Sequence, residues 1–147
     1  MNLKQAQVFT PEWVTNDMID LLDQSCLSDH ETFFFEPTCG DGEMLVVIVE
    51  RIYKALMQKF GEHERAFSET IFKFYATELD EELVPKARMR IFNWAIKNAG
   101  RELTSLEQSL IALQLAQSIE CRDALKVSIP NIDSSPGMRA IKRKKAK

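Results

Sequence analysis

The sequence predicts an α/β fold, in which a short parallel sheet is flanked by helices. Segments with apolar residues at helical spacing alternate along the chain with short runs of aromatic and β-branched residues. Strands that are joined by helices pair in parallel, so the alternation indicates a parallel sheet. The chain has 147 residues, of which 45% are hydrophobic, and this is enough for one domain with its own core. We expect that domain to comprise residues 1–127.

The first helix is expected to begin at Thr10 and to end near Asp23. Thr10 offers a capping hydroxyl, Pro11 suits the first helical position, and Glu12 places an acid in the first turn. Trp13 is expected in the core. Four further apolar residues share one helical face, which we expect to pack inward: Val14, Met18, Leu21 and Leu22.

A short buried strand is predicted at 33–36, where three phenylalanines precede Glu36. A loop with Gly40 and Gly42 follows and leads into a long helix, for which Gly61 is a plausible end. The apolar residues that recur at helical spacing in this helix are Met44, Ile48, Ile52 and Leu56.

The second strand is predicted at 71–78, after a polar loop that follows Gly61. Its residues, IFKFYATE, are rich in the aromatic and β-branched types that favour strands. Asp80 is a candidate cap for the next helix, whereas Pro85 fits only in a first helical turn. The sequence therefore does not decide where between Asp80 and Pro85 the helix begins. The helix is expected to end at Gly100. Its inward face is predicted to hold Leu83, Ala87, Ile91, Trp94 and Asn98.

Thr104 and Glu107 have the spacing of a capping box, which predicts a further helix that ends near Gln117. Its leucines at 106, 110 and 113 are expected to point inward. Residues 119–122 are predicted to form a third strand. The residues from Ser128 onward contain prolines, serines and a glycine typical of a loop, so we expect residues 128–147 to form a flexible loop and basic tail.

The charge of the chain is unevenly distributed. The formal net charge of -3 comprises +6 from the last nine residues and −9 from the rest. A basic tail on an acidic body indicates contact with DNA or another acidic partner, although a solubilising tail would look the same. No apolar run approaches the roughly 20 residues that span a bilayer, and residues 1–7 do not resemble a signal peptide. We therefore expect a cytoplasmic protein without membrane contact.

The cysteines do not indicate a disulfide framework, a metal site or a nucleophile. Cys26, Cys39 and Cys121 are odd in number and far apart, and the sequence adds only His30 and His63 as histidine ligands. A thiol nucleophile needs a nearby base or positive charge, and none accompanies these cysteines in sequence. We assign Cys39 to packing and expect neither a catalytic cysteine nor a bound metal.

The loop between the first strand and the long helix is the leading candidate for a binding site. Ligands of open α/β sheets lie beyond the carboxyl ends of the strands. Gly40 and Gly42 permit a sharp turn and a close approach of the backbone to a ligand, and the following helix begins with free N–H groups. A simple tight turn would show the same two glycines. Their position between strand and helix favours a ligand site.

Acidic residues at the ends of the other two strands extend this candidate site. Glu78 is well placed to accept hydrogen bonds from both hydroxyls of a ribose, although an acid that stabilises the next helix would occupy the same position. Asp123 is able to accept a hydrogen bond from the exocyclic amine of adenine. Alone it would be an ordinary loop aspartate, so its assignment depends on the order of the neighbouring motifs.

Four segments appear in the order found in N6-adenine-specific DNA methyltransferases of restriction-modification type, and the chain resembles that family over about residues 5–125. These segments are QVFTP at 7–11, FFFEPTCGDGEML at 33–45, YATELD at 75–80 and CRDAL at 121–125. The resemblance implies a Rossmann-like fold that binds S-adenosylmethionine as cofactor, of which the chain holds the N-terminal, cofactor-binding part. It therefore implies an incomplete methyltransferase fold.

The resemblance also implies roles for individual residues. Phe9, Thr10 and Pro11 would surround the methionine end of the cofactor. Glu36, Thr38, Gly40 and Gly42 would face its amino-acid and sulfonium portion. Glu78 would bind the ribose and Asp123 the adenine. The methionine end carries both charges, which an acid and a set of backbone amides would match.

The sequence departs from the family at the catalytic motif. Members of the family hold the flipped adenine with an Asn or Asp, Pro, Pro, aromatic sequence. None of the prolines here follows an Asn, an Asp or another Pro, and no target-recognition region is recognisable. We therefore expect a cofactor-binding protein that acts in DNA methylation with a partner chain or is an inactive remnant.

Two alternatives remain open. In the first, the chain is a non-enzymatic interaction or regulatory module of a restriction or anti-restriction system. Alternatively, it is a small complete methyltransferase in which Asn131 and Asp133 serve an unusual acceptor. In the family sheet a fourth strand pairs with the first, so the first strand is expected to have an open edge. We predict that residues 126–132, another chain or self-association covers this edge.

Overall fold

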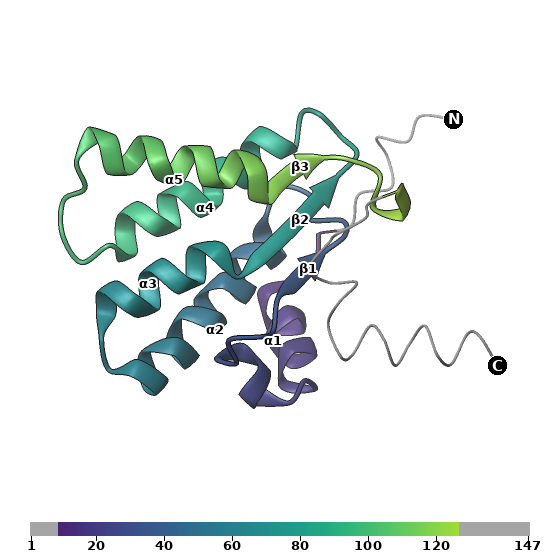
Figure 1. Ribbon diagram of the computed structural model, residues 1–147. Helices are drawn as coiled ribbons and strands as arrows, with labels where there is room; N and C mark the ends of the chain where they lie inside the picture. The colour runs from purple at the N-terminus through teal and green to yellow at the C-terminus, as the bar shows by residue number, and fades with distance from the viewer. Residues whose placement is uncertain (1–8, 127–147) are drawn as a thin grey trace, which may run out of the picture.

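The computed structural model describes residues 9–126, which form a parallel three-stranded sheet with helices packed against it (Figure 1). This confirms the predicted α/β class. The strands lie in the order β1 (Phe34–Glu36), β2 (Phe74–Glu78) and β3 (Ile119–Cys121). The helices are α1 (Glu12–Asp20), α2 (Glu43–Phe60), α3 (His63–Phe72), α4 (Val84–Asn98) and α5 (Ser105–Ser118), with short 3-10 turns η2 (Gln24–Leu27) and η3 (Ala124–Lys126). The predicted loop and basic tail at 128–147 lie outside the described residues.

One face of the sheet packs against the helices and forms the main core. Phe34 of β1 is level with Phe74 of β2, and Ala76 is level with Ile119 of β3. Side chains on successive strand residues alternate between faces, so these residues share one face. They join a core that also holds Leu45 and Val49 of α2, Ala87, Ile91 and Trp94 of α4, and Leu115 of α5. A smaller core joins α1, η2, α2 and α3 through Ile19, Leu27, Ile52, Leu56 and Ala66.

The opposite face of the sheet carries Phe35 and Tyr75, whose rings stack with centroids 5.8 Å apart. Neither ring belongs to either of the two cores. The Tyr75 hydroxyl donates to Glu120 Oε2 at 2.5 Å, and burial together with this carboxylate raises the pKa of Tyr75 to about 12. Within residues 9–126, β1 pairs with β2 alone, so its other edge has no partner strand there. Lys126 ends η3, and the rest of the segment predicted to cover this edge is outside the described residues.

Several predicted elements are confirmed. Gly61 follows α2 in the left-handed conformation, with φ 63°, and its N–H donates to the carbonyl of Met57. Pro85 lies in the first turn of α4, as its missing N–H requires. Thr104 and Glu107 form a complete capping box at the start of α5. Among the described helices, none is long and apolar enough to cross a membrane.

The prediction for the first helix is wrong in its cap, its inward face and its length. Pro11 occupies the N-cap position of α1, without a side-chain cap, and Thr10 does not cap the helix. The residues that pack inward are Thr15 and Ile19, because α1 lies against α2 through this side. Most of the residues predicted to pack inward are instead exposed, by 68% for Trp13, 51% for Met18, 87% for Leu21 and 45% for Leu22.

The predicted polar loop after Gly61 is instead the helix α3, so that prediction is wrong. The start of this segment is mostly polar, but Ala66, Thr70 and Ile71 recur at helical spacing and are buried. Residues 71 and 72 belong to this helix, and β2 therefore begins at Phe74. Asp80 is likewise no helix cap: its carboxylate accepts from the N–H of Glu82 in the turn that precedes α4.

The predicted orientation of α5 is also wrong. Leu106, Leu110 and Leu113 are exposed by 69%, 56% and 59%, whereas Leu115 and Ser118 are buried. The helix is apolar on nearly all sides, so its sequence does not determine which side faces the core. Contacts with α3, α4 and β3 determine it instead.

Candidate functional site

The loop between β1 and α2 is attached to the carboxyl end of β2. The Cys39 N–H donates to the carbonyl of Thr77 at 3.0 Å, and the Thr77 hydroxyl donates to the carbonyl of Pro37 at 2.8 Å. Within the loop, the Gly42 N–H donates to the carbonyl of Cys39 at 2.9 Å. These bonds hold the backbone of the loop in one conformation beyond the end of the sheet.

The two glycines of the loop have different roles. Both have positive φ, 56° at Gly40 and 90° at Gly42, which other residues rarely adopt. A Cβ on Gly42 would lie 3.0 Å from the Cα of Ala87, so Gly42 allows the loop to approach α4 closely. A Cβ on Gly40 would meet nothing within 4 Å. The backbone of the loop is therefore accessible to another molecule at Gly40 and not at Gly42.

Glu78, at the end of β2, fixes the position of Gly40. Its Oε2 accepts from the Gly40 N–H at 2.9 Å, and its Oε1 accepts from the N–H groups of Leu79 at 2.8 Å and Asp80 at 3.0 Å. A carboxylate has about four acceptor positions, so these bonds leave little capacity for further donors. Glu78 therefore stabilises the glycine loop directly.

Glu36 ends β1 and accepts through Oε1 from the Thr38 N–H at 3.0 Å and from its hydroxyl at 3.4 Å. Its Oε2 has no hydrogen-bond partner within the part of the chain that the structure describes. Asp41 is paired more strongly, because Arg90 of α4 donates to its Oδ2 at 2.7 Å and to its carbonyl at 3.1 Å. Arg90 also lies 3.8 Å from the Glu43 carboxylate.

A cavity of about 420 Å³ lies beside this loop. Its walls come from the residues before α1, from α1 itself, from the glycine loop and from the first turn of α2. They hold three carboxylates, those of Glu36, Asp41 and Glu43, and no Lys, Arg or His among the described residues that line the cavity. The volume is within the usual range for small-molecule sites, roughly 300–1,000 Å³. Because Arg90 offsets Asp41 and lies near Glu43, the part of the cavity beside Glu36 is the part that suits a positively charged group.

The structure brings together a subset of the residues predicted for the site. Those that line the cavity are Phe9, Thr10, Glu36, Thr38 and Gly40. Pro11 and Gly42 are adjacent in sequence to lining residues but do not line it themselves. Asp123 follows β3, on the far side of β2 from the cavity; its Oδ1 accepts from the Leu125 N–H at 3.0 Å.

Sequence reasoning did not identify every residue that lines the cavity. Met18 and Met44 contribute apolar surface, and Asp41 and Glu43 add two of the three acids. Asp41 lies in the glycine loop and Glu43 in the first turn of α2. Because both follow Gly40 closely in sequence, they could have been predicted as part of the site. Met18 was assigned to the core, and only the packing of α1 against α2 shows that it borders the cavity.

Cys39 packs inward from the same loop. It is 4% exposed and belongs to the main core. Burial, reinforced by the negative charges of Glu78 and Glu36, raises the pKa of its thiol to about 12. The thiol is therefore protonated at neutral pH, which disfavours a nucleophilic role.

Comparison with protein-family models, with curated proteins and with solved structures finds no match. The residues that line the cavity, and their charges, are therefore the evidence for a function.

Proposed function

We propose that the chain binds S-adenosylmethionine in the acid-lined cavity beside Gly40, as the cofactor-binding part of an adenine-specific DNA methyltransferase. The observation that carries the proposal is the charge of the cavity at the end of a parallel strand. Three carboxylates and no basic residue are among the described residues that line it. Arg90, just outside the lining, offsets Asp41 and lies near Glu43, so the charge available to a ligand comes mainly from Glu36. Dinucleotides and ATP bring phosphates, which this lining would repel, whereas the cofactor brings an ammonium and a sulfonium group.

Glu36 and Gly40 are the residues that we expect to contact the methionine end of the cofactor. The free Oε2 of Glu36 is an acceptor for the ammonium group, and a charge-assisted hydrogen bond of this kind is stronger than a neutral one. The open space beside Gly40 lets the ligand approach the backbone. Phe9, Thr10 and Met18 would cover the other side of the ligand.

The role proposed for Glu78 is a supporting one. Because its carboxylate already accepts three backbone N–H groups, we expect it to hold the loop and to offer at most one bond to a ribose hydroxyl. The adenine of the cofactor would extend toward β3 and Asp123. An Asp123→Asn variant would show whether that carboxylate contributes to affinity.

Isothermal titration with S-adenosylmethionine tests the proposal. Glu36→Gln removes one negative charge at nearly constant volume and should weaken binding about tenfold, or roughly 1.4 kcal/mol. Glu62→Gln is the matched control, because Glu62 is exposed at the far end of α2 and should leave the affinity unchanged. Equal affinity of both variants and of the unmodified chain would refute the proposed site.

We further propose that methyl transfer requires a second chain. The sequence contains no Asn or Asp, Pro, Pro, aromatic motif to hold a flipped adenine, so that group would have to come from a partner. Transfer of a labelled methyl group to DNA should be absent with this chain alone and present when the products of neighbouring genes are added. Transfer by the chain alone would instead favour the unusual acceptor at Asn131 and Asp133.

A second candidate function, that of a non-enzymatic interaction module, is favoured by the open β1 edge and by the Phe35–Tyr75 face of the sheet. In that case the cavity would have no ligand, and association with a partner protein would be independent of the cofactor. A pull-down with and without S-adenosylmethionine distinguishes the two functions, because cofactor-dependent capture is expected only of the first.

A further inference from the structure

Arg90, in the middle of α4, connects that helix to the loop between β1 and α2. Its Nε donates to the carbonyl of Asp41 at 3.1 Å, and one of its terminal nitrogens donates to Asp41 Oδ2 at 2.7 Å. One guanidinium group therefore holds both the backbone and the side chain of a single loop residue. Because a guanidinium presents its N–H groups in a rigid planar arrangement, two such bonds fix the orientation of Asp41 as well as its distance from α4.

The Asp41 carboxylate is engaged at both oxygens. Its Oδ1 accepts from the N–H of Glu43 at 3.2 Å, and its Oδ2 accepts from Arg90. The side chain of Asp41 is only 17% exposed, so this pair is better shielded from solvent than an ordinary surface ion pair. Asp41 therefore lines the cavity with a charge that Arg90 already offsets.

A second contact between α4 and the loop lies one helical turn away. Gly42 approaches Ala87 so closely that a Cβ on Gly42 would lie 3.0 Å from the Ala87 Cα. Ala87 and Arg90 are three residues apart and so share one side of α4. Between these two contacts and the cavity lies Gly40, where the backbone is accessible. A change at Arg90 therefore reaches the loop residue that faces the cavity.

Glu36 differs from Asp41 in its partners. Within the part of the chain that the structure describes, Glu36 forms no ion pair, and its Oε1 accepts only from Thr38. The cavity thus has one acid whose charge is offset and one whose charge is not. This difference places the strongest attraction for a positive group beside Glu36.

We propose that Arg90 is a positioning residue for the cofactor: it holds the glycine loop against α4 and offsets Asp41, so that the positively charged methionine end is directed to Glu36. This rests on the proposed function, because it concerns the orientation of the ligand in the same cavity. Without Arg90, Asp41 would be a second anion next to Gly40 and would attract the same positive groups. The loop would also lose a contact that holds it in place.

The two roles of Arg90 are separable by titration with S-adenosylmethionine and S-adenosylhomocysteine, because only the first carries a sulfonium charge. Arg90→Gln removes both roles, so both ligands should bind more weakly. The ratio of their affinities should rise about threefold in favour of S-adenosylmethionine, and more at low salt, because the cavity gains negative charge. Arg90→Lys keeps the charge but cannot reproduce both bonds to Asp41. Both affinities should then fall severalfold while their ratio stays the same.

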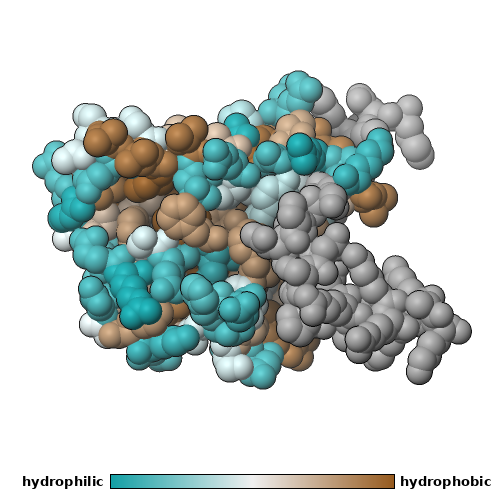
Figure 2. All heavy atoms as spheres, in the orientation of Figure 1, coloured by the Kyte–Doolittle hydropathy of each residue, from teal (hydrophilic) through white to brown (hydrophobic). Residues whose placement is uncertain are grey.

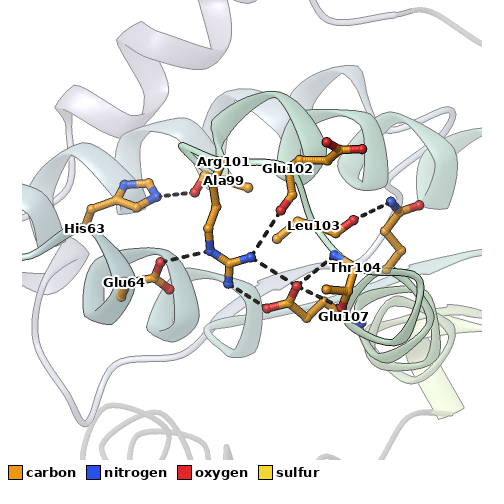
Figure 3. Close-up of polar contacts among 9 residues, drawn as sticks. His63, Glu64, Ala99, Arg101, Glu102, Leu103, Thr104 and Glu107 are labelled. Carbon is orange, nitrogen blue, oxygen red and sulfur yellow. Dashed lines mark hydrogen bonds and ion pairs between the residues drawn. The ribbon is translucent and has the colours of Figure 1, made fainter.

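The matched control is Arg101, which precedes α5 at a mainly apolar part of the surface (Figure 2). Arg101 donates to the Glu107 carboxylate at 2.6 and 3.1 Å and lies 3.5 Å from Glu64 of α3 (Figure 3). Glu64 follows the far end of α2, an 18-residue helix about 27 Å long whose first turn borders the cavity. Arg101→Gln removes the same charge and should leave both affinities and their ratio unchanged.

Hydrogen exchange of the chain without ligand tests the loop independently of the cofactor. The N–H groups of Cys39 and Gly42, which bond within and beneath the loop, should exchange about tenfold faster in both Arg90 variants and at the normal rate in Arg101→Gln. Circular dichroism would show that the variants keep their helices. If Arg90→Gln does not fold, Arg90→Lys still tests the loop.

The outcomes separate this proposal from the proposed function. Unchanged exchange of the loop amides in the Arg90 variants overturns the positioning role. Binding of S-adenosylmethionine with an unchanged affinity ratio in Arg90→Gln overturns the effect on charge and leaves the proposed function intact. No heat from S-adenosylmethionine with the unmodified chain overturns the proposed function and, with it, the effect of Arg90 on the ligand.

Discussion

The cavity beside Gly40 and the leucine row on α5, formed by the exposed Leu106, Leu110 and Leu113, lie on different parts of the molecule and differ in how their groups are held. Around the cavity, polar groups are fixed by hydrogen bonds to backbone N–H groups, as with the Oε1 atoms of Glu36 and Glu78. On α5, ion pairs fix only the start of the helix, and the leucines beyond it remain exposed. The lining of the cavity is rich in carboxylates, whereas the exposed surface of α5 is mostly apolar.

This difference implies that the two regions respond differently to substitution. Changes to the glycine loop should affect both stability and cofactor binding, because the same bonds hold the loop and shape the cavity. Changes to the exposed leucines of α5 should leave both nearly unchanged, because these side chains are mostly in solvent. The following substitutions test that contrast, from the largest expected effect to the smallest.

The largest expected contrast lies within α5 itself. Leu115→Ala removes a side chain that is 1% exposed in the main core and should lower the free energy of unfolding by about 3 kcal/mol. Leu113→Ala, on the exposed row, should change it by less than about 0.5 kcal/mol in the monomer. Urea unfolding at low protein concentration measures both values. Similar losses in the two variants would show that the row is not a free surface.

The two glycines of the loop should also differ. Gly42→Ala introduces a Cβ 3.0 Å from the Cα of Ala87 at positive φ, and should cost about 3 kcal/mol. Gly40→Ala has the backbone strain without the contact, and should cost about 1.5 kcal/mol while weakening cofactor binding. Unfolding curves combined with titrations separate these effects. If Gly40→Ala were as destabilising as Gly42→Ala, the space assigned to the ligand would be filled by protein.

Glu78 tests whether the loop and the cavity are coupled. Glu78→Ala leaves the N–H groups of Gly40, Leu79 and Asp80 without their acceptor and should destabilise the chain by about 2 kcal/mol. It should also weaken cofactor binding, because Gly40 loses its anchor. Glu62→Ala provides the control at an exposed site. Normal cofactor affinity in the Glu78 variant would contradict the coupling.

The smallest expected effect concerns pH at the start of α5. Hydrogen bonds from Arg101 and from Thr104 lower the pKa of Glu107 from 4.5 to about 2. A lowered folded-state pKa means that this contribution to stability is present above about pH 4.5 and is lost as the pH falls toward 2. The stability difference between the unmodified chain and Glu107→Gln should therefore shrink over this range. A constant difference in thermal unfolding from pH 5 to pH 2 would contradict this assignment.

The elements with strong local signals were predictable from sequence. The capping box at Thr104, the left-handed Gly61 and the aromatic residues of β2 each indicate one structure through short-range chemistry. Helix α3 was missed because residues 62–70 are mostly polar and its last two apolar residues, Ile71 and Phe72, were assigned to the following strand. The inward side of α5 was not predictable, because that helix is apolar nearly all round and its neighbours decide its rotation.

The candidate site was predictable to a similar extent. The glycine loop and Glu36 follow from the strand, turn and helix order, and the structure places both at the cavity. The bonds of Glu78 were not predictable, since they depend on how the loop folds back over β2. Met18 and Met44 line the cavity only because α1 packs beside α2. Sequence thus indicated the position of the cavity, and tertiary packing determined its walls.

We propose above all that the cavity beside Gly40 selects S-adenosylmethionine by charge. A calorimetric series with S-adenosylmethionine, S-adenosylhomocysteine, ATP and NAD tests it most directly. We expect binding of S-adenosylmethionine, weaker binding of S-adenosylhomocysteine because it lacks the sulfonium charge, and no heat from the two phosphate ligands. Binding of ATP or NAD in preference to S-adenosylmethionine, or no heat from S-adenosylmethionine at high protein concentration, would contradict the account.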